Sequence, residues 1–169
     1  MNRNAFRIAV GTMLVFGLTN VAAAQAGRGC SNATLKGAWG YTETGSVIAP
    51  NPNPPGGTVT LAAAAVGRYE FDRAGNFEGE QDSSANGAVG HDTKTGTYTI
   101  TPECTGTLTL MAFREGVLQR QSVWTFVLVD HGQEMRAIMT SMALPNGIPL
   151  SPIMTMTARR VLPIWAFWD

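Results

Sequence analysis

The chain is poor in charged residues and has few lysines and cysteines. Only 14% of its 169 residues are Asp, Glu, Lys or Arg, compared with about 25% in an average soluble domain. Lys36 and Lys94 are the only lysines, and 12 basic residues balance 12 acidic ones. Because there is no basic cluster, the composition predicts neither a nucleic-acid partner nor binding to an anionic membrane surface.

Sequence motifs of known mechanism are missing as well. The chain contains no G-x-S-x-G, P-loop or H-E-x-x-H pattern. Neither a cofactor nor a metal is therefore expected.

The first 24 residues have the composition of a secretory signal peptide. Arg3 and Arg7 precede an apolar run over 8–18. Residues 22–24 offer a small-residue cleavage site before Gln25. An uncleaved anchor is the alternative, but this run is shorter than the roughly 20 residues of a membrane-spanning helix. We expect residues 25–169 to form one secreted or periplasmic domain with a net charge of −2 and no membrane span.

Cys30 and Cys104 are the only cysteines. In an exported protein an even pair is most simply a disulfide. A metal site would need more ligands than two distant cysteines, and a redox pair is more often C-x-x-C. The sequence therefore predicts a structural disulfide between Cys30 and Cys104.

The remaining chain is organised as strand-like runs separated by turn signals. Within the runs apolar or small residues alternate with polar ones, which is typical of strands with one buried face. Gly, Pro, Asn and Asp gather between the runs. The predicted strands are 35–48, 58–72, 76–83, 95–101, 106–113, 117–129, 133–143 and 152–162, with a Gly- and Asn-containing loop over 84–94.

Eight sequential strands predict an all-β fold, an eight-stranded antiparallel up-and-down β-barrel, because closure removes exposed sheet edges. If the first strand starts at the lower end, Cys30 and Cys104 both fall at that end, as a disulfide requires. Most predicted upper links are long, and the lower ones are tight. We therefore expect a cup that is tied at its bottom, and that either holds one small ligand or is filled by side chains.

Gly37-Ala38-Trp39 resembles the G-x-W element of lipocalins. In that family the tryptophan packs near the closed end, often beside an arginine from late in the chain. The resemblance implies that Arg159 or Arg160 stacks on Trp39. The long helix that lipocalins carry after the eighth strand has no evident counterpart in residues 161–169.

Longer segments resemble a group of small secreted bacterial proteins, largely uncharacterised, whose barrel is compared with allene oxide cyclase or lipocalins. This likeness implies the barrel fold and export, and it implies no reaction. Its segments are Cys30-x4-Leu35-x-Gly37, Gly67-x-Tyr69-x-Phe71-Asp72-x2-Gly75-Asn76, 96–106 and 126–132.

Glu43 is the candidate acid–base residue. It has the strand parity of Trp39 and Tyr41, which we expect to face inward. A carboxyl group inside an apolar barrel has a raised pKa and can serve as acid, base or ligand anchor. A bulge near Gly40 or Gly45 that turns Glu43 outward is the alternative.

The other polar candidates are expected on the outside. We predict His91 in an upper loop and His131 in a lower turn, too far apart for a shared site. Glu78, Glu80 and Asp82 share one strand face, which we expect to be solvated; a cation site is the alternative.

Methionines cluster in the last four predicted strands. Thioethers adapt to irregular partners, so they suit a pocket for a variable apolar ligand, with ordinary core filling as the alternative. Both faces of this half are apolar, since Ile138 and Met142 alternate with Met135 and Met139. We expect the outer face to meet the C-terminal tail or a second copy of the chain.

The candidate ligand-binding residues are Tyr41, Glu43, Tyr69, Tyr98, Trp124, Met135 and Met139.

Three classes of function remain open. The barrel could carry a small apolar or amphipathic molecule, act as a cyclase- or isomerase-like enzyme through Glu43, or be a filled structural or interaction protein. A solid interior would exclude the first two. A desolvated Glu43 beside a tyrosine would favour the enzyme over the carrier.

Overall fold

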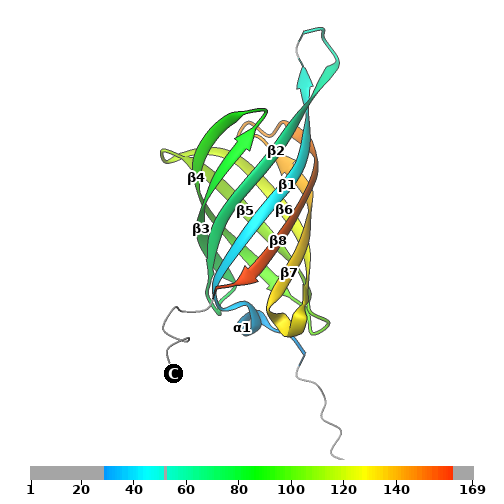
Figure 1. The fold of residues 1–169 in the computed structure, drawn as a ribbon. Coiled ribbons are helices and arrows are strands. Elements are labelled where there is room, and N and C mark those ends of the chain that lie inside the picture. Colours follow the sequence, from blue (N-terminus) through cyan, green and yellow to red (C-terminus); the bar gives the residue numbers. More distant parts are fainter. Residues whose placement is uncertain (1–28, 52, 162–169) are drawn as a thin grey trace, which may run out of the picture.

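The computed structural model describes residues 29–51 and 53–161, which form a closed barrel of eight antiparallel strands (Figure 1). Each strand pairs with the next, and β1 closes on β8, so the predicted up-and-down barrel is confirmed. The predicted signal peptide lies outside the described residues. The elements in chain order are α1 (Asn32–Leu35), β1 (Gly37–Asn51), β2 (Gly57–Phe71), β3 (Asn76–Ala85), β4 (Ala88–Ile100), β5 (Thr105–Arg114), β6 (Val117–Val129), the 3-10 turn η1 (Asp130–Gly132), β7 (Glu134–Ala143) and β8 (Pro149–Arg160).

The predicted loop over 84–94 is wrong. β3 continues to Ala85 and β4 starts at Ala88, with only Asn86 and Gly87 between them. Both turn residues have left-handed backbones, with φ of 48° and 86°, as a two-residue hairpin turn of type I′ requires. The link between β5 and β6, which was predicted to be short, has the same conformation. These two upper links are shorter than the four-residue lower links, so the predicted contrast between tight lower and long upper links is also wrong.

The hairpin of β1 and β2 rises above the rim of the barrel (Figure 1). β1 pairs with β8 only as far as Ile48, and β2 pairs with β3 only from Ala63. The two strands pair with each other up to Asn51 and Gly57, which the sequence predicted to be loop. The tip of this hairpin is therefore a two-stranded ribbon without lateral neighbours among the described residues.

The lower end is closed by α1. Leu35 is fully buried there, and its carbonyl accepts a hydrogen bond from Trp39 Nε1 at 2.8 Å. The Arg160 guanidinium lies 4.9 Å from the Trp39 ring and donates to the carbonyls of Thr34 and Lys36, both at 2.6 Å. The predicted stacking of an arginine on Trp39 is therefore confirmed for Arg160, which fastens the closing segment to the end of β8.

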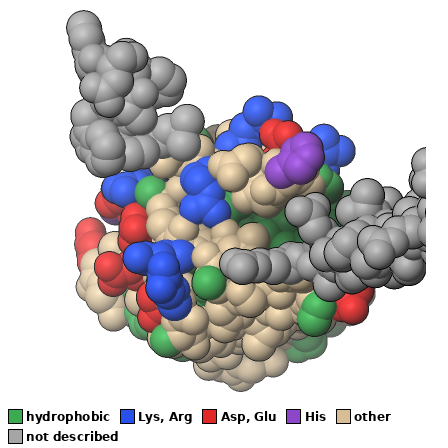
Figure 2. All heavy atoms as spheres, turned by 90° about the horizontal axis from the view of Figure 1, so that it is seen from below, with side chains coloured by type: hydrophobic (Ala, Val, Ile, Leu, Met, Phe, Trp, Pro, Cys, Tyr) green, Lys and Arg blue, Asp and Glu red, His purple; other side chains and the backbone are tan. Residues whose placement is uncertain are grey.

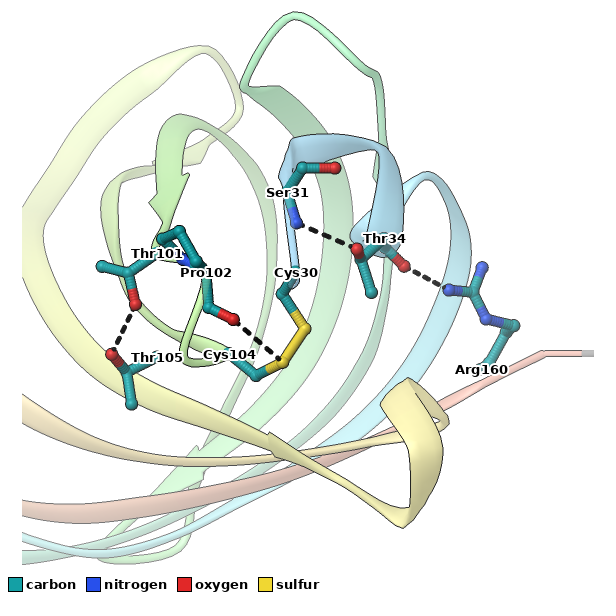
Figure 3. Close-up of a disulfide and its surroundings, with 8 residues drawn as sticks. All are labelled: Cys30, Ser31, Thr34, Thr101, Pro102, Cys104, Thr105 and Arg160. Atoms are coloured by element: carbon teal, nitrogen blue, oxygen red, sulfur yellow. Dashed lines mark hydrogen bonds between the residues drawn. A yellow bond between two sulfur atoms is a disulfide. The ribbon is translucent and has the colours of Figure 1, made fainter. Parts of the chain in front are cut away.

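The predicted disulfide joins Cys30 to Cys104 at this lower end (Figure 3). It lies beside α1, and the Cys30 N–H also donates to the Pro102 carbonyl at 3.1 Å. The bridge spans 74 residues and ties the segment before β1 to the link between β4 and β5.

Seen from below, basic and acidic side chains are interspersed rather than gathered into one patch of one sign (Figure 2).

Strand faces follow the predicted alternation except at a register shift between β5 and β6 and in β7. Its register with β8 shifts between Ile138 and Met142, so Met139 and Met142 both turn inward. The predicted common face of Ile138 and Met142 is therefore wrong, and Ile138 is exposed. The second copy or C-terminal tail expected against this outer wall stays a prediction; the tail, 162–169, lies outside the described residues. No helix in residues 29–51 and 53–161 is long and apolar enough to cross a membrane.

Candidate functional site

The lower half of the barrel is filled by aromatic side chains. Tyr69 stacks on Tyr41 with ring centroids 4.2 Å apart, and it meets Phe77 edge to face. Phe71 links this group to Tyr98 and to Trp39 below. Trp124, Phe126 and Met135, from the opposite wall, are also buried. The described side chains of this half therefore pack into one buried cluster.

A buried ion pair lies above the aromatic layer. Lys94 Nζ donates to Glu43 Oε1 at 2.8 Å and to the Tyr69 hydroxyl at 3.1 Å. The Tyr69 hydroxyl lies 3.4 Å from the same carboxylate oxygen. The side chains of Lys94 and Glu43 are only 1% and 5% exposed. Each therefore compensates the charge of the other, which would be costly to bury without a partner.

Asp92 is the centre of a second buried network. Its carboxylate accepts hydrogen bonds from Arg114 Nε at 2.9 Å, Arg120 Nη1 at 3.0 Å and Gln81 Nε2 at 3.2 Å. The Tyr41 hydroxyl donates to the side-chain oxygen Oε1 of Gln81 at 3.4 Å, so this network joins the aromatic layer. One carboxylate thus serves two guanidinium groups.

The surroundings shift the pKa values of four groups in this layer. Burial, and then the charge of Glu43, raise the pKa values of the Tyr41 and Tyr69 hydroxyls well above the usual range, so both remain neutral donors. Burial lowers the pKa of Lys94, and the charge of Glu43 opposes that effect. Burial also acts to raise the pKa of Asp92, but the two arginines outweigh it and hold that pKa below its usual value.

Above this polar layer the barrel encloses a cavity of about 250 Å³. Its polar lining comes from Glu43, Gln81, Ser83, Ser84, Arg114 and Arg120. The rest is mainly apolar: Val47, Leu61, Ala63, Ala65, Met139, Met142, Leu150 and Met154. The cavity therefore offers a polar floor and apolar walls.

The structure places all the predicted ligand-binding residues inside the barrel but does not bring them all together. Glu43 and Met139 line the cavity. Tyr41 and Tyr69 support its floor through hydrogen bonds. Tyr98, Trp124 and Met135 lie in the filled lower half, and Tyr98 donates to the Asn32 carbonyl of α1 at 2.9 Å. A binding or catalytic role stays a prediction for each of these residues.

Glu43 itself faces inward and is 4% exposed. The register of β1 with β2 is unbroken from Gly37 to Asn51, so no bulge turns this side chain outward. It is not an isolated acid, however, because Lys94 pairs with it.

Five polar residues of the floor were not predicted from the sequence: Lys94, Asp92, Gln81, Arg114 and Arg120. Lys94 and Asp92 have the parity of Tyr98, two and three inward positions further up the same strand, but the predicted loop hid this continuity. The signal that could have found them is Asn86-Gly87, because this dipeptide strongly favours a hairpin turn.

The outward-facing candidates do not form a site. His91 lies in β4 rather than in the predicted loop, and its Nδ1 is 2.9 Å from Asp82 Oδ1 on the exposed face of β3. His131 lies in the lower turn as predicted and is fully exposed. Glu78 and Glu80 face outward with Asp82. In the part of the chain that the structure describes, no three His, Cys, Asp or Glu side chains are grouped as metal ligands.

Comparison with protein-family models and with curated protein sequences finds no match for this chain. The closed eight-stranded barrel is compatible with lipocalin-type and allene oxide cyclase-type barrels in general. Membership of either family stays a prediction.

Proposed function

We propose that this protein is exported and that its upper cavity binds a small amphipathic molecule. The observation that carries this proposal is a cavity of about 250 Å³ with apolar walls and a polar floor, above a filled lower half. At about 30 Å³ for each water in the liquid, this volume corresponds to about eight waters. A ligand with on the order of eight to ten non-hydrogen atoms suits it. The disulfide and the signal-peptide pattern of residues 1–24 support export.

The walls of the cavity differ in a way that suits binding. Ala63 and Ala65 of β2 line one side of the cavity with methyl groups, and larger side chains at these positions would fill the cavity. Met139, Met142 and Met154 face the cavity from β7 and β8, and thioether side chains adjust to irregular partners. The space is therefore maintained by small residues and bounded by adaptable ones.

Methionine methyl groups provide a direct test. In protein labelled with [13C-methyl]methionine, titration with octanoate and, separately, with 1-octanol should shift the signals of Met139, Met142 and Met154. The Met111 signal should stay in place, because Met111 lies on the outer face and is 39% exposed. Shifts confined to Met111, or no shifts with either probe, would contradict the proposal.

A matched pair of variants locates the binding. Ala63→Phe puts an aromatic ring into the cavity, whereas Ala62→Phe puts the same ring on the exposed face one residue earlier. We expect the first variant to abolish the methyl shifts and the second to keep them. Equal binding by both variants would place the ligand elsewhere.

Proton-transfer catalysis at Glu43 is the second candidate function. Its carboxylate lines the cavity and has the Tyr69 hydroxyl 3.4 Å away, which is the arrangement that favours an enzyme. If Glu43 removes protons from carbon, 4-oxooctanoate incubated with the protein in D2O should gain deuterium next to its ketone. Mass spectrometry should show this gain with the native protein and not with Glu43→Gln; incorporation at the buffer rate in both would exclude the role.

A further inference from the structure

The floor of the upper cavity has an excess of positive charge. Three inward-facing cations, Lys94, Arg114 and Arg120, meet two acids, Glu43 and Asp92, among the described residues of this layer. Lys94 is paired with Glu43, and both arginines share Asp92. One positive charge is therefore left without a counter-charge beside a cavity that reaches solvent.

Arg120 is the residue on which this charge has free donors. A guanidinium group has five N–H donors, yet its hydrogen bonds to described residues use only Nη1. Its side chain is 22% exposed and lines the cavity. The Asp92 oxygens already accept from three side chains, so they have little capacity left for the remaining Arg120 donors.

Arg114 approaches the same carboxylate as Arg120 because Gly90 leaves room for its side chain. Gly90 of β4 faces inward, and a Cβ atom there would overlap the Arg114 guanidinium. The missing side chain leaves the space in which Arg114 reaches Asp92 through Nε and Nη2, both at 2.9 Å. The two guanidinium groups thus approach one carboxylate from β5 and β6.

We propose that the ligand of this cavity carries a singly charged anionic headgroup, in the simplest case a carboxylate, which binds Arg120 on the cavity floor. Such a group would neutralise the excess charge and occupy the free donors, because guanidinium and carboxylate groups match in geometry. The apolar chain of the ligand then lies against Met139, Met142 and Met154, toward the upper opening. This inference rests on the proposed function, since it identifies the chemical class of the molecule bound there.

Three probes of one chain length test the headgroup: octanoate, 1-octanol and octylammonium, each titrated against the methionine methyl signals at neutral pH. We expect octanoate to bind at least about ten-fold more tightly than 1-octanol, given the strength of hydrogen bonds to charged groups. Octylammonium should bind more weakly than either.

Arg120→Gln should reduce octanoate affinity about ten-fold or more and change 1-octanol affinity by less than about three-fold. Asp92 keeps Arg114 as a partner in this variant. Arg68→Gln, on the exposed face of β2, is the matched control and should bind octanoate like the native protein.

The outcomes separate the two proposals. If 1-octanol or octylammonium binds as tightly as octanoate, the anionic headgroup is wrong and the ligand-binding function stands. The same conclusion follows if Arg120→Gln binds all three probes unchanged. If no probe shifts the cavity methyls, both proposals fail. Should Arg120→Gln not fold, the ranking of the three probes on the native protein still decides the question.

Discussion

Replacing Lys94 with Met should destabilise the protein strongly. Lys94 is the only cation within hydrogen-bonding distance of Glu43 among the described residues, and the Glu43 side chain is 5% exposed. Its loss leaves a carboxylate buried without a counter-charge, which typically costs about 3–5 kcal/mol. With an m-value of about 2 kcal/mol/M, the urea midpoint should fall by about 1.5–2.5 M.

The control is Lys36→Met, which removes the only other lysine from an exposed position and should change stability by less than about 0.5 kcal/mol. The double variant Glu43→Leu/Lys94→Met should recover most of the loss, because a buried ion pair replaced by apolar side chains is often neutral. We expect a coupling energy of about 2 kcal/mol or more. If Lys94→Met costs less than about 1 kcal/mol, or the single effects simply add, the buried ion pair does not exist as described.

Three further predictions concern other parts of the barrel. Replacing both disulfide cysteines with Ser opens a loop of 74 residues, so the free energy of unfolding should fall by about 4.5 kcal/mol. A fall of less than about 1 kcal/mol would show that the bridge hardly constrains the unfolded chain. The hydrogen bond to Asp82 raises the pKa of His91 above 6.5. The contribution of this hydrogen bond to stability is therefore complete below pH 6.5 and is lost as the pH rises through the folded-state pKa. NMR titration should show the raised pKa of His91, and Asp82→Asn should bring that pKa back toward 6.5. Gly67→Ala places a Cβ against the backbone carbonyl of Glu80 and the phenol group of Tyr41, and it should cost about 1–3 kcal/mol in urea unfolding. Gly40→Ala, whose Cβ has only ordinary contacts, should cost less; equal costs would mean that these two contacts do not limit the size of residue 67.

The barrel could be predicted from the sequence because its information is local and repeated. Strand alternation and turn residues identified seven of the eight strands with only small errors at their ends, and strand parity put both cysteines at one end. The Trp39–Arg160 contact was accessible only through the resemblance to lipocalins. The inward position of Glu43 followed from parity with Tyr41, since no bulge interrupts β1.

The ion pairs of the polar floor could not be predicted, because their residues look like surface residues in the sequence. Asp92 and Lys94 are charged and lie next to Gly90 and His91, a composition typical of a loop. Only their partners on β1, β5 and β6 make their burial favourable, and those pairs are far apart in the sequence. The bulge that turns Met142 inward lies where β7 changes register against both β6 and β8.

The central claim is that an anionic amphipathic molecule binds headgroup-down in the upper cavity. A crystal structure of the protein soaked with 8-bromooctanoate tests it most directly, because anomalous scattering locates the bromine independently of the protein density. We predict one bromine site beside Met139, Met142 and Met154, with the carboxylate on Arg120. Bromine found only on the outer wall, or a carboxylate directed toward solvent with the chain on the floor, would contradict the account.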